Sequence, residues 1–414
     1  MKEDAVMLQE VVAIGYGTKT RATTTGAVDL VNADKLTNKP LTNTAELLQG
    51  VVPGMEIRRT NQGKVGEEGY DIRLRGVTSR SDPGILVVVD GIPYSDNNAN
   101  ALNKINPQDI ENITILKDAQ AAIYGARAAG GVLLVTTKKG KTEKPTISYT
   151  GNFNFNTPAS VPQKVNVLQH IEMMGELYAN DGISNHFFTH LLPYVNTADI
   201  YSKNPEVVKG PFGDTPDLVL GWHDWWKEMY GTAFDHSHNL SISGGSEKSN
   251  YYASIGYLDQ GSMFNYGEHN NKKYWGRFKY EYNLNKYIKL RSNVYVGRKK
   301  VTEPYDINQL AWLTYWTWNC QPTFNPQGQY YGSGGFGNPI AFAEHTVNRW
   351  KTYYSYYTQL GFDITPLKNL TITGDMSLNY DISDEKYYRK RHQTYHWDGS
   401  LNYDVIDYWY SGKT

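Results

Sequence analysis

A strict two-residue alternation of apolar and polar side chains runs through the C-terminal two-thirds of this chain and limits its fold more than any other feature. In residues 146–156 the apolar positions are Ile147, Tyr149, Phe153 and Phe155, and every even position is Thr, Ser or Asn. Successive side chains of a β-strand point to opposite faces, so the pattern predicts a strand with one apolar face. Six further segments match it, two strongly and four more weakly: 274–284 and 370–380, then 238–244, 250–258, 288–296 and 354–364.

The connections between these seven predicted strands alternate in length. Residues 157–237, 259–273 and 297–353 are long connections, whereas 245–249, 285–287 and 365–369 are short. Outer-membrane β-barrels have long extracellular loops and tight periplasmic turns, and strands of roughly 9–11 residues cross their membrane. The order therefore favours a membrane barrel. A soluble β-sandwich or a meander of hairpins remains the alternative.

Composition agrees with this interpretation and excludes other classes. The formal net charge is −1, so charge implies no nucleic-acid partner, and no apolar run reaches the roughly 18 residues of a membrane-spanning helix. The 33 tyrosines and 10 tryptophans fit the aromatic girdles of a barrel. Cys320 is the single cysteine, which excludes an intrachain disulfide and a cysteine-based zinc site.

The N-terminal third has a different pattern. Residues 84–94 predict a strand that turns at Asp90-Gly91, and residues 105–140 continue with a short helix, a strand, a helix and a strand. Asn43 and Glu46 have the spacing of a capping box for a helix through Gln49, and further strands are expected over 55–60 and 70–75. This order predicts a compact α+β domain.

The sequence of residues 84–140 closely resembles the plug domain of SusC/RagA-type TonB-dependent outer-membrane transporters. Leu8–Thr18 (LQEVVAIGYGT) and the amphipathic helix expected over 166–180 resemble the same family. The predicted fold is an α+β plug domain followed by antiparallel transmembrane β-barrel strands. Its expected divisions are a TonB-box region and linker (1–17), the plug (18–140) and the first part of the barrel with long extracellular loops (141–414).

Barrel size bears on how much of the protein this sequence represents. A plugged lumen requires about 22 strands, whereas a barrel of about eight strands is filled by its own side chains. We therefore expect the sequence, with about 7–8 strands, to be part of a longer protein. The absence of a signal-peptide h-region after Met1 leads to the same expectation.

The resemblance implies TonB-dependent import of oligosaccharide or peptide nutrients across the bacterial outer membrane. The implied partners are TonB with its inner-membrane energising complex, a SusD-like surface lipoprotein, and outer-membrane lipid. No enzymatic activity, cofactor, metal or nucleic acid is implied. Two alternatives stay open: a TonB-linked signalling receptor and a soluble carbohydrate-binding β-protein.

The resemblance and the residues together suggest two coupling sites. A TonB contact is expected at Glu10, Val11, Val12, Ala13 and Ile14. This short β-prone run is followed by a segment expected to be flexible (Thr18–Gly26), so it could add as a strand to a partner's sheet. The alternative is that it forms an ordinary first strand of the plug. Arg73 and Arg75 share one strand face, so both are expected to pair with barrel-wall carboxylates and to couple plug movement to the barrel, unless that face is merely solvated.

The long loops carry the candidate substrate contacts, which are Trp222, Trp225, Trp226, Trp312, Trp316 and Trp318. Aromatic faces pack against sugar C–H groups and apolar peptide side chains, and the alternative is packing between loops. His186 and His190 have helical i,i+4 spacing, but the glutamate of a zinc-protease motif is missing. Residues 125–132 lack the Lys and Ser/Thr of a phosphate loop. Neither motif predicts a site.

Overall fold

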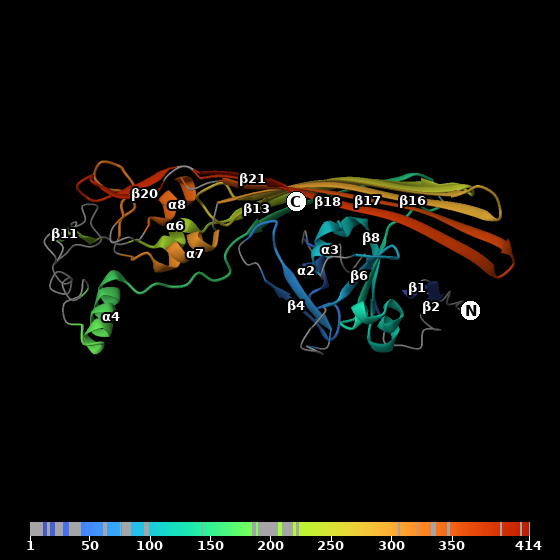
Figure 1. Ribbon diagram of the computed structural model, residues 1–414, viewed down its shortest axis with the longest axis horizontal. Coiled ribbons are helices and arrows are strands. Elements are labelled where there is room, and N and C mark those ends of the chain that lie inside the picture. The colour runs from blue at the N-terminus through green and yellow to red at the C-terminus, as the bar shows by residue number, and fades with distance from the viewer. Residues whose placement is uncertain are drawn as a thin grey trace, which may run out of the picture.

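The structure is a computed structural model, and it has two parts that lie against each other (Figure 1). One is an N-terminal α+β domain, and the other is a long antiparallel sheet with loops gathered at one end. The residues that the structure describes are 11–14, 17–20, 28–32, 43–60, 64–74, 76, 84–94, 99–142, 144–183, 188, 206–208, 218–220, 223–304, 307–319, 321–332, 337–345, 348–389, 391–405 and 408–413.

The N-terminal domain is built on a five-stranded sheet of order β3-β8-β9-β6-β7 and a separate β4-β5 hairpin. Within the larger sheet only β6 and β9 run parallel. The elements are β3 (Val28–Asn32), α2 (Thr44–Leu48), β4 (Met55–Arg59), β5 (Tyr70–Leu74), β6 (Leu86–Val89), β7 (Ile92–Pro93), α3 (Ala99–Lys104), η2 (Pro107–Asp109), β8 (Ile110–Leu116), η3 (Asp118–Tyr124), η4 (Ala126–Ala128) and β9 (Val132–Thr137).

The domain folds around strands that are apolar on both faces. All four residues of β6 are buried, as the unbroken apolar run of this segment predicts for a strand covered on both sides. One face packs on α2, α3 and the hairpin, and the other packs on η3 and η4. The Asn43 side chain caps α2 by accepting the Ala45 N–H, as predicted, while the Glu46 carboxylate accepts the Tyr70 hydroxyl instead of completing a capping box.

The large sheet contains eight strands in sequence order, and every neighbouring pair is antiparallel. Seven of them confirm the seven strands predicted from alternation. The strands are β10 (Thr146–Asn156), β13 (Ala233–Gly245), β14 (Ser249–Gly261), β15 (Asn270–Asn283), β16 (Ile288–Pro304), β17 (Asn348–Leu367), β18 (Leu370–Arg389) and β21 (Tyr408–Lys413).

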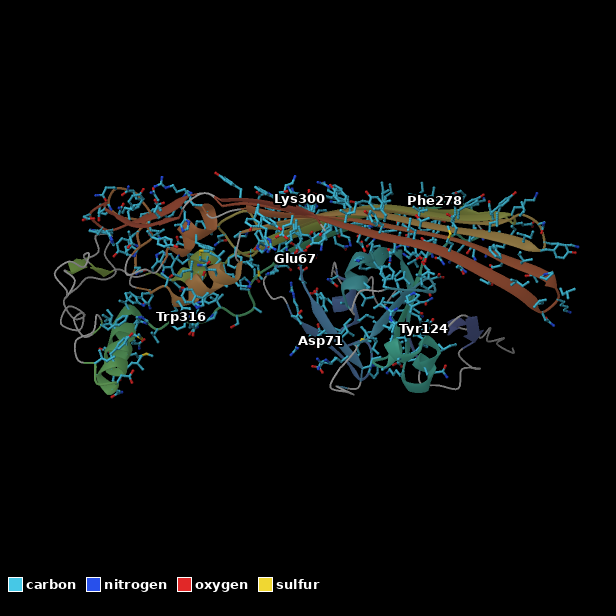
Figure 2. All side chains as sticks on the ribbon, viewed as in Figure 1. Glu67, Asp71, Tyr124, Phe278, Lys300 and Trp316 are labelled. Atoms are coloured by element: carbon cyan, nitrogen blue, oxygen red, sulfur yellow. The ribbon has the colours of Figure 1, made fainter. Side chains whose placement is uncertain are left out.

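The two faces of this sheet differ in what they contact. We call the face against the N-terminal domain the inner face; on β15, β16 and β17 it carries the odd-numbered residues, such as Arg277, Asn293 and Gln359. The outer face carries the even-numbered residues of the same strands, among them the exposed Phe278 and Val296. Figure 2 shows Phe278 on the side of the sheet away from the domain and Glu67 on the side facing it.

The long connections hold the remaining elements at one end of the sheet (Figure 1). They are α4 (Val167–Asn180), which begins with the capping box Asn166/Gln169, β11 (Glu206–Val208), β12 (Leu218–Leu220), α6 (Trp225–Met229), α7 (Ile307–Trp316), α8 (Pro339–His345), β19 (His392–Tyr395) and β20 (Leu401–Val405). Within the described ranges, no helix combines the length and the hydrophobicity needed to cross a membrane.

One local prediction needs correction. Residues 18–20, expected to be flexible, belong to β2 (Gly17–Thr20), which pairs with β1 (Val11–Ile14). The helix expected before the last strand of the N-terminal domain is the 3₁₀ helix η3. The last strand of the large sheet, β21, pairs with the end of β18.

Candidate functional site

The N-terminal domain is fixed to the inner face by a buried carboxylate, Asp109. It ends the short helix η2, and its side chain is fully buried. Its Oδ1 accepts hydrogen bonds from the hydroxyls of Tyr252 (2.9 Å) and Ser254 (2.7 Å), and its Oδ2 lies 3.4 Å from Nε of the equally buried Arg277. A buried ion pair is tolerated when further hydrogen bonds satisfy both partners, and this one meets that condition.

A second carboxylate, Asp90, lies in the predicted Asp-Gly turn. Its φ of 48° places it in the left-handed region that Asp tolerates better than most residues. The carboxylate accepts the Thr137 N–H and hydroxyl within the domain, and it binds Lys279 Nζ (3.0 Å) and Asn293 Nδ2 (2.9 Å) of the sheet. Burial raises the pKa of Asp90, but the charges of Lys279 and Arg277 and the Thr137 hydrogen bonds outweigh it, so the pKa lies below its ordinary value.

The third contact is made by segment 64–69, part of the connection between strands β4 and β5 of the hairpin. This segment reaches the inner face of the large sheet near the loops. The Glu67 carboxylate binds Lys351 Nζ at 2.8 and 2.9 Å and accepts the Tyr353 hydroxyl. Next to it, the Gly66 carbonyl accepts a hydrogen bond from Lys299 Nζ (2.8 Å). Gly66 has a φ of 77°, and a Cβ there would meet the side chain of Asn271 at 2.5 Å, so only glycine fits.

Two titratable side chains, Glu67 and His269, take part in the contacts of segment 64–69, and both have lowered pKa values. Burial raises the pKa of Glu67. The hydrogen bonds from Lys351 and Tyr353 and the nearby lysine charges lower it by a larger amount, so the pKa of Glu67 lies below its ordinary value of 4.5. His269, in the loop before β15, accepts the Val65 N–H at its Nε2 (3.3 Å). Burial lowers the pKa of His269 to about 4, although the Glu67 charge opposes the shift. Both groups therefore favour the docked segment at neutral pH.

At these three contacts the charges are arranged in the reverse of the way expected at Arg73 and Arg75. The domain contributes the carboxylates and the sheet contributes the cations at all three contacts above. The ion pair described for Arg73 is with Asp71 of its own strand (2.9 Å), and Figure 2 shows Asp71 on the side of the domain away from the sheet. Arg75 lies outside the described residues. Coupling through these two arginines stays a prediction.

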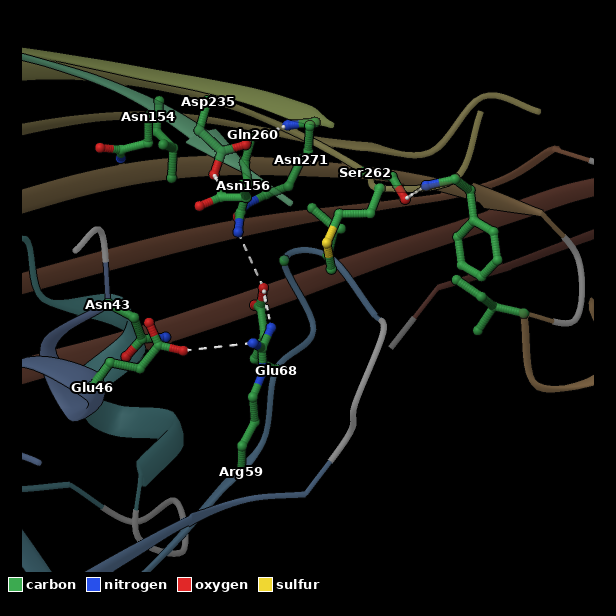
Figure 3. Close-up of a pocket in the computed structure, with 18 of the residues that line it drawn as sticks. Asn43, Glu46, Arg59, Glu68, Asn154, Asn156, Asp235, Gln260, Ser262 and Asn271 are labelled. Carbon is green, nitrogen blue, oxygen red and sulfur yellow. Dashed lines mark hydrogen bonds and ion pairs between the residues drawn. The ribbon is translucent and has the colours of Figure 1, made fainter. Parts of the chain in front are cut away.

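A polar chamber of about 660 Å³ lies between the domain, the inner face and the loops (Figure 3). Glu68 extends into it and binds Arg59 (3.3 Å) and the Gln260 amide (3.2 Å). On the sheet side, Asp235 accepts the Asn156 amide (2.6 Å). A second chamber of about 680 Å³ lies next to segment 64–69, and both are lined by Gly66, Glu68, Lys273 and Lys299. Segment 64–69 therefore lines both chambers.

The loop tryptophans divide into two groups. Trp225 is fully buried among α6, α7 and α8 and donates its Nε1 hydrogen to the Trp318 carbonyl, so it cannot touch a ligand in this arrangement. Trp226 stacks on Tyr230, and Trp318 meets Phe188 edge to face. Trp312 and Trp316 lie side by side on α7 with about half of each surface exposed, and Figure 2 shows Trp316 on the inner side of the loops. Trp222 lies outside the described residues.

The predicted TonB contact is partly described. Val11–Ile14 form β1 and pair with β2, with Val12 opposite Lys19. Glu10 lies outside the described residues, as do His186 and His190. Within the described ranges no group of three His, Cys, Asp or Glu side chains is placed to hold a metal ion.

Sequence reasoning missed Glu67, Asp90 and Asp109 as interface residues. In the sequence Asp90 indicates only a turn, and no pattern marks Glu67, which lies between the strands predicted over 55–60 and 70–75. One signal in the sequence could have indicated them. The polar face of the strand predicted over 274–284 includes Arg277 and Lys279, and cations on a face that becomes buried need carboxylate partners.

Comparison with known proteins agrees with this architecture. A family model described as the TonB-dependent receptor plug domain matches residues 20–132. The TonB-dependent receptor SusC of Bacteroides thetaiotaomicron is 34% identical over 272 residues, covering 64% of this chain and 24% of that receptor. The TonB-dependent receptor P26 of Formosa agariphila is 31% identical over 397 residues, covering 91% of this chain and 36% of that receptor. The chain thus spans about a quarter to a third of their length.

Solved structures share the fold. A structure of the RagAB peptide importer in its closed-closed state superposes with a TM-score of 0.71 at 24% identity, covering 89% of this chain and 42% of that one. These relatives are receptors and importers rather than enzymes. An N-terminal plug packed on the inner face of antiparallel strands, with these sequence relatives, leads to one conclusion: the chain belongs to the SusC/RagA type of TonB-dependent receptors.

Proposed function

We propose that this protein imports oligosaccharide or peptide nutrients across the bacterial outer membrane in a TonB-dependent manner. The observation that carries the proposal is the docked plug. A folded domain lies on the polar inner face of strands whose outer face is apolar, and it is held there by contacts that are ionic rather than covalent. Such a domain blocks a pore and can still be moved by a mechanical pull.

The route for the substrate begins at the loops. In this proposal the exposed Trp312 and Trp316 bind the nutrient first, and the chamber lined by Glu68, Asp235 and Asn156 receives it next. Hydrogen-bonding groups on three sides suit the hydroxyls of a sugar or the backbone of a peptide. A SusD-like lipoprotein would close the loop end from outside.

Energy enters at the opposite end. The β1-β2 hairpin lies beside the N-terminal domain on the side of the short turns (Figure 1), where a periplasmic TonB protein would reach it. Strand addition to β1 would transmit a pull to the plug through backbone hydrogen bonds.

The test is uptake by cells of the source bacterium. We expect deletion of the gene to abolish uptake of at least one class among fluorescent oligosaccharides and fluorescent peptides, and deletion of tonB or addition of a protonophore to have the same effect. Recovery of the protein in the soluble periplasmic fraction would instead favour a carbohydrate-binding β-protein. Normal uptake of every probe, with loss of substrate-induced transcription, would favour a signalling receptor.

A further inference from the structure

The side chains on the outer face of the sheet become more polar from row to row toward the loops. Each row is a set of residues that are cross-strand partners on neighbouring strands. The row Ile255, Gly276, Val296, Tyr356 and Tyr380 is apolar and aromatic. The next row toward the loops has three tyrosines, one isoleucine and one arginine: Tyr257, Tyr274, Arg298, Tyr354 and Ile382. The row beyond it is charged or polar throughout: Asp259, Lys272, Lys300, Thr352 and Asp384. This order matches the lipid core, interface and headgroup level of a bilayer.

Three cations of these two rows form a compact group, which we call the rim cluster: Lys272, Arg298 and Lys300. Lys272 and Lys300 are direct cross-strand partners, so their Cβ atoms are about 4.5–5.5 Å apart. Arg298 is two residues before Lys300 on the same face and lies diagonally from Lys272. Figure 2 shows Lys300 on the outer side of the sheet and nearer the loops than Phe278.

The rim cluster has more positive charge than its neighbours neutralise. Asp259 pairs with Lys272 at 3.4 Å, and Asp384 lies near Lys386 at 3.7 Å. Within the described part of the chain, neither Arg298 nor Lys300 has an ion pair or a side-chain hydrogen bond. Like charges placed directly opposite each other destabilise a sheet, so the arrangement favours binding of an external anion.

We propose that the rim cluster binds the phosphate group of a membrane lipid headgroup. Arginine and lysine together suit phosphate, because the guanidinium offers a fork of donors and the ammonium a compact charge. The apolar and aromatic rows directly below would hold the acyl chains of the same molecule, which a free phosphate ion could not use. This inference rests on the proposed membrane location and adds to it a defined lipid site.

The test uses the full-length receptor in mixed micelles that contain equal amounts of a phosphatidic acid and a diacylglycerol with the same acyl chains. Native mass spectrometry then counts the lipids that remain bound. We expect the wild type to retain phosphatidic acid in preference to diacylglycerol. The triple variant Lys272→Gln, Arg298→Gln, Lys300→Gln should retain at least about tenfold less phosphatidic acid than the wild type. A matched variant, Lys248→Gln, Lys286→Gln, Lys368→Gln, removes three charges from the short turns at the other end and should behave as the wild type.

Each other outcome has a distinct meaning. Equal retention of both lipids by the wild type overturns the phosphate site but leaves the membrane assignment standing. Retention of neither lipid contradicts the membrane location itself. Binding of inorganic phosphate to the wild type as tightly as phosphatidic acid, measured by titration calorimetry, overturns the lipid as the ligand. A triple variant that keeps the wild-type preference overturns the assignment to these residues.

Discussion

At the scale of single residues, the plug is held by a few carboxylates whose surroundings differ. Asp109 and Arg277 are both buried, whereas Lys104 and Asp381 also join plug to sheet but are partly exposed. Removing one member of a buried pair leaves an uncompensated charge, while an exposed pair contributes little. The two pairs therefore provide a matched comparison within one interface.

We expect Asp109→Asn to lower the free energy of unfolding by about 3–5 kcal/mol, because Arg277 loses its buried counter-charge. Asp381→Asn should cost no more than about 1 kcal/mol. Guanidinium unfolding of the full-length receptor in detergent, followed by tryptophan fluorescence, measures both. Equal losses for the two variants would show that burial of the Asp109 pair is unimportant.

The pH dependence of segment 64–69 follows from His269 and Glu67. Because the docked pKa of His269 is lowered to about 4, the stability it contributes is complete above its ordinary value near 6.5 and is lost as pH falls toward 4. The lowered pKa of Glu67 has the same sign, with its contribution lost below 4.5. We expect the protection factors of the amides in residues 64–69, which are exchange rates corrected for the intrinsic rate at each pH, to fall as the pH drops from 6.5 to 4.

A substitution separates the two groups. A glutamine at position 269 retains an acceptor for the Val65 N–H but does not titrate, so His269→Gln should remove the part of the change between pH 6.5 and 4.5. His345→Gln, at the end of α8, serves as the control and should leave the profile unchanged. A profile that is flat in the wild type would contradict this account.

At the scale of elements, the sequence predicted the strands better than it predicted the loops. The inner and outer faces of β15 follow directly from alternation, since a strand has only two faces. Trp225 and Trp316 are both loop tryptophans in the sequence, yet one is buried and the other exposed, because burial there depends on how α6, α7 and α8 pack together. No local pattern carries that information.

The two tryptophans should respond differently to truncation. Trp316→Ala should weaken binding of the imported nutrient by roughly 1–3 kcal/mol and leave thermal stability unchanged, as for an exposed aromatic anchor. Trp225→Ala should lower stability by about 3–5 kcal/mol through the cavity it leaves. Calorimetric binding and thermal unfolding of both variants distinguish the roles, and unchanged affinity in Trp316→Ala would assign that residue to packing.

The β1 strand is the element through which we expect TonB to act. Val12→Pro removes a backbone N–H and blocks strand addition, so uptake should collapse while substrate binding and membrane insertion persist. Val12→Ile keeps the backbone donor and the β-branched shape and should import normally. Normal import by the proline variant would mean that energy coupling occurs elsewhere. Because β1 already pairs with β2, the variant's plug stability should be measured alongside uptake.

At the scale of the whole molecule, the order plug then antiparallel strands was predictable, but the way the two dock was not. Sequence reasoning placed cations on the plug, whereas Asp90 and Asp109 meet Arg277 and Lys279 across the interface. Pairing across an interface depends on which positions of two separate elements come together, and a single sequence does not contain that information.

The eight-stranded sheet has β10 and β21 at its edges. Unpaired backbone groups of an edge strand are not satisfied by lipid, so residues 1–414 expressed alone should form oligomers or aggregates in detergent. Residues 18–140 alone should fold as a soluble domain around their own buried strands. Size-exclusion chromatography with light scattering checks both, and a monodisperse monomer of residues 1–414 would contradict the expectation.

The alternation of faces also limits how such a sequence can change over evolution. Inserting or deleting one residue in β15 would exchange its two faces, turning Arg277 and Lys279 toward lipid and Phe278 toward the plug. A lineage can therefore alter these strands by substitution or by steps of two residues. The connections 157–232, 305–347 and 390–407 lie outside the eight-stranded sheet and have no such constraint, so length differences between descendants should accumulate there.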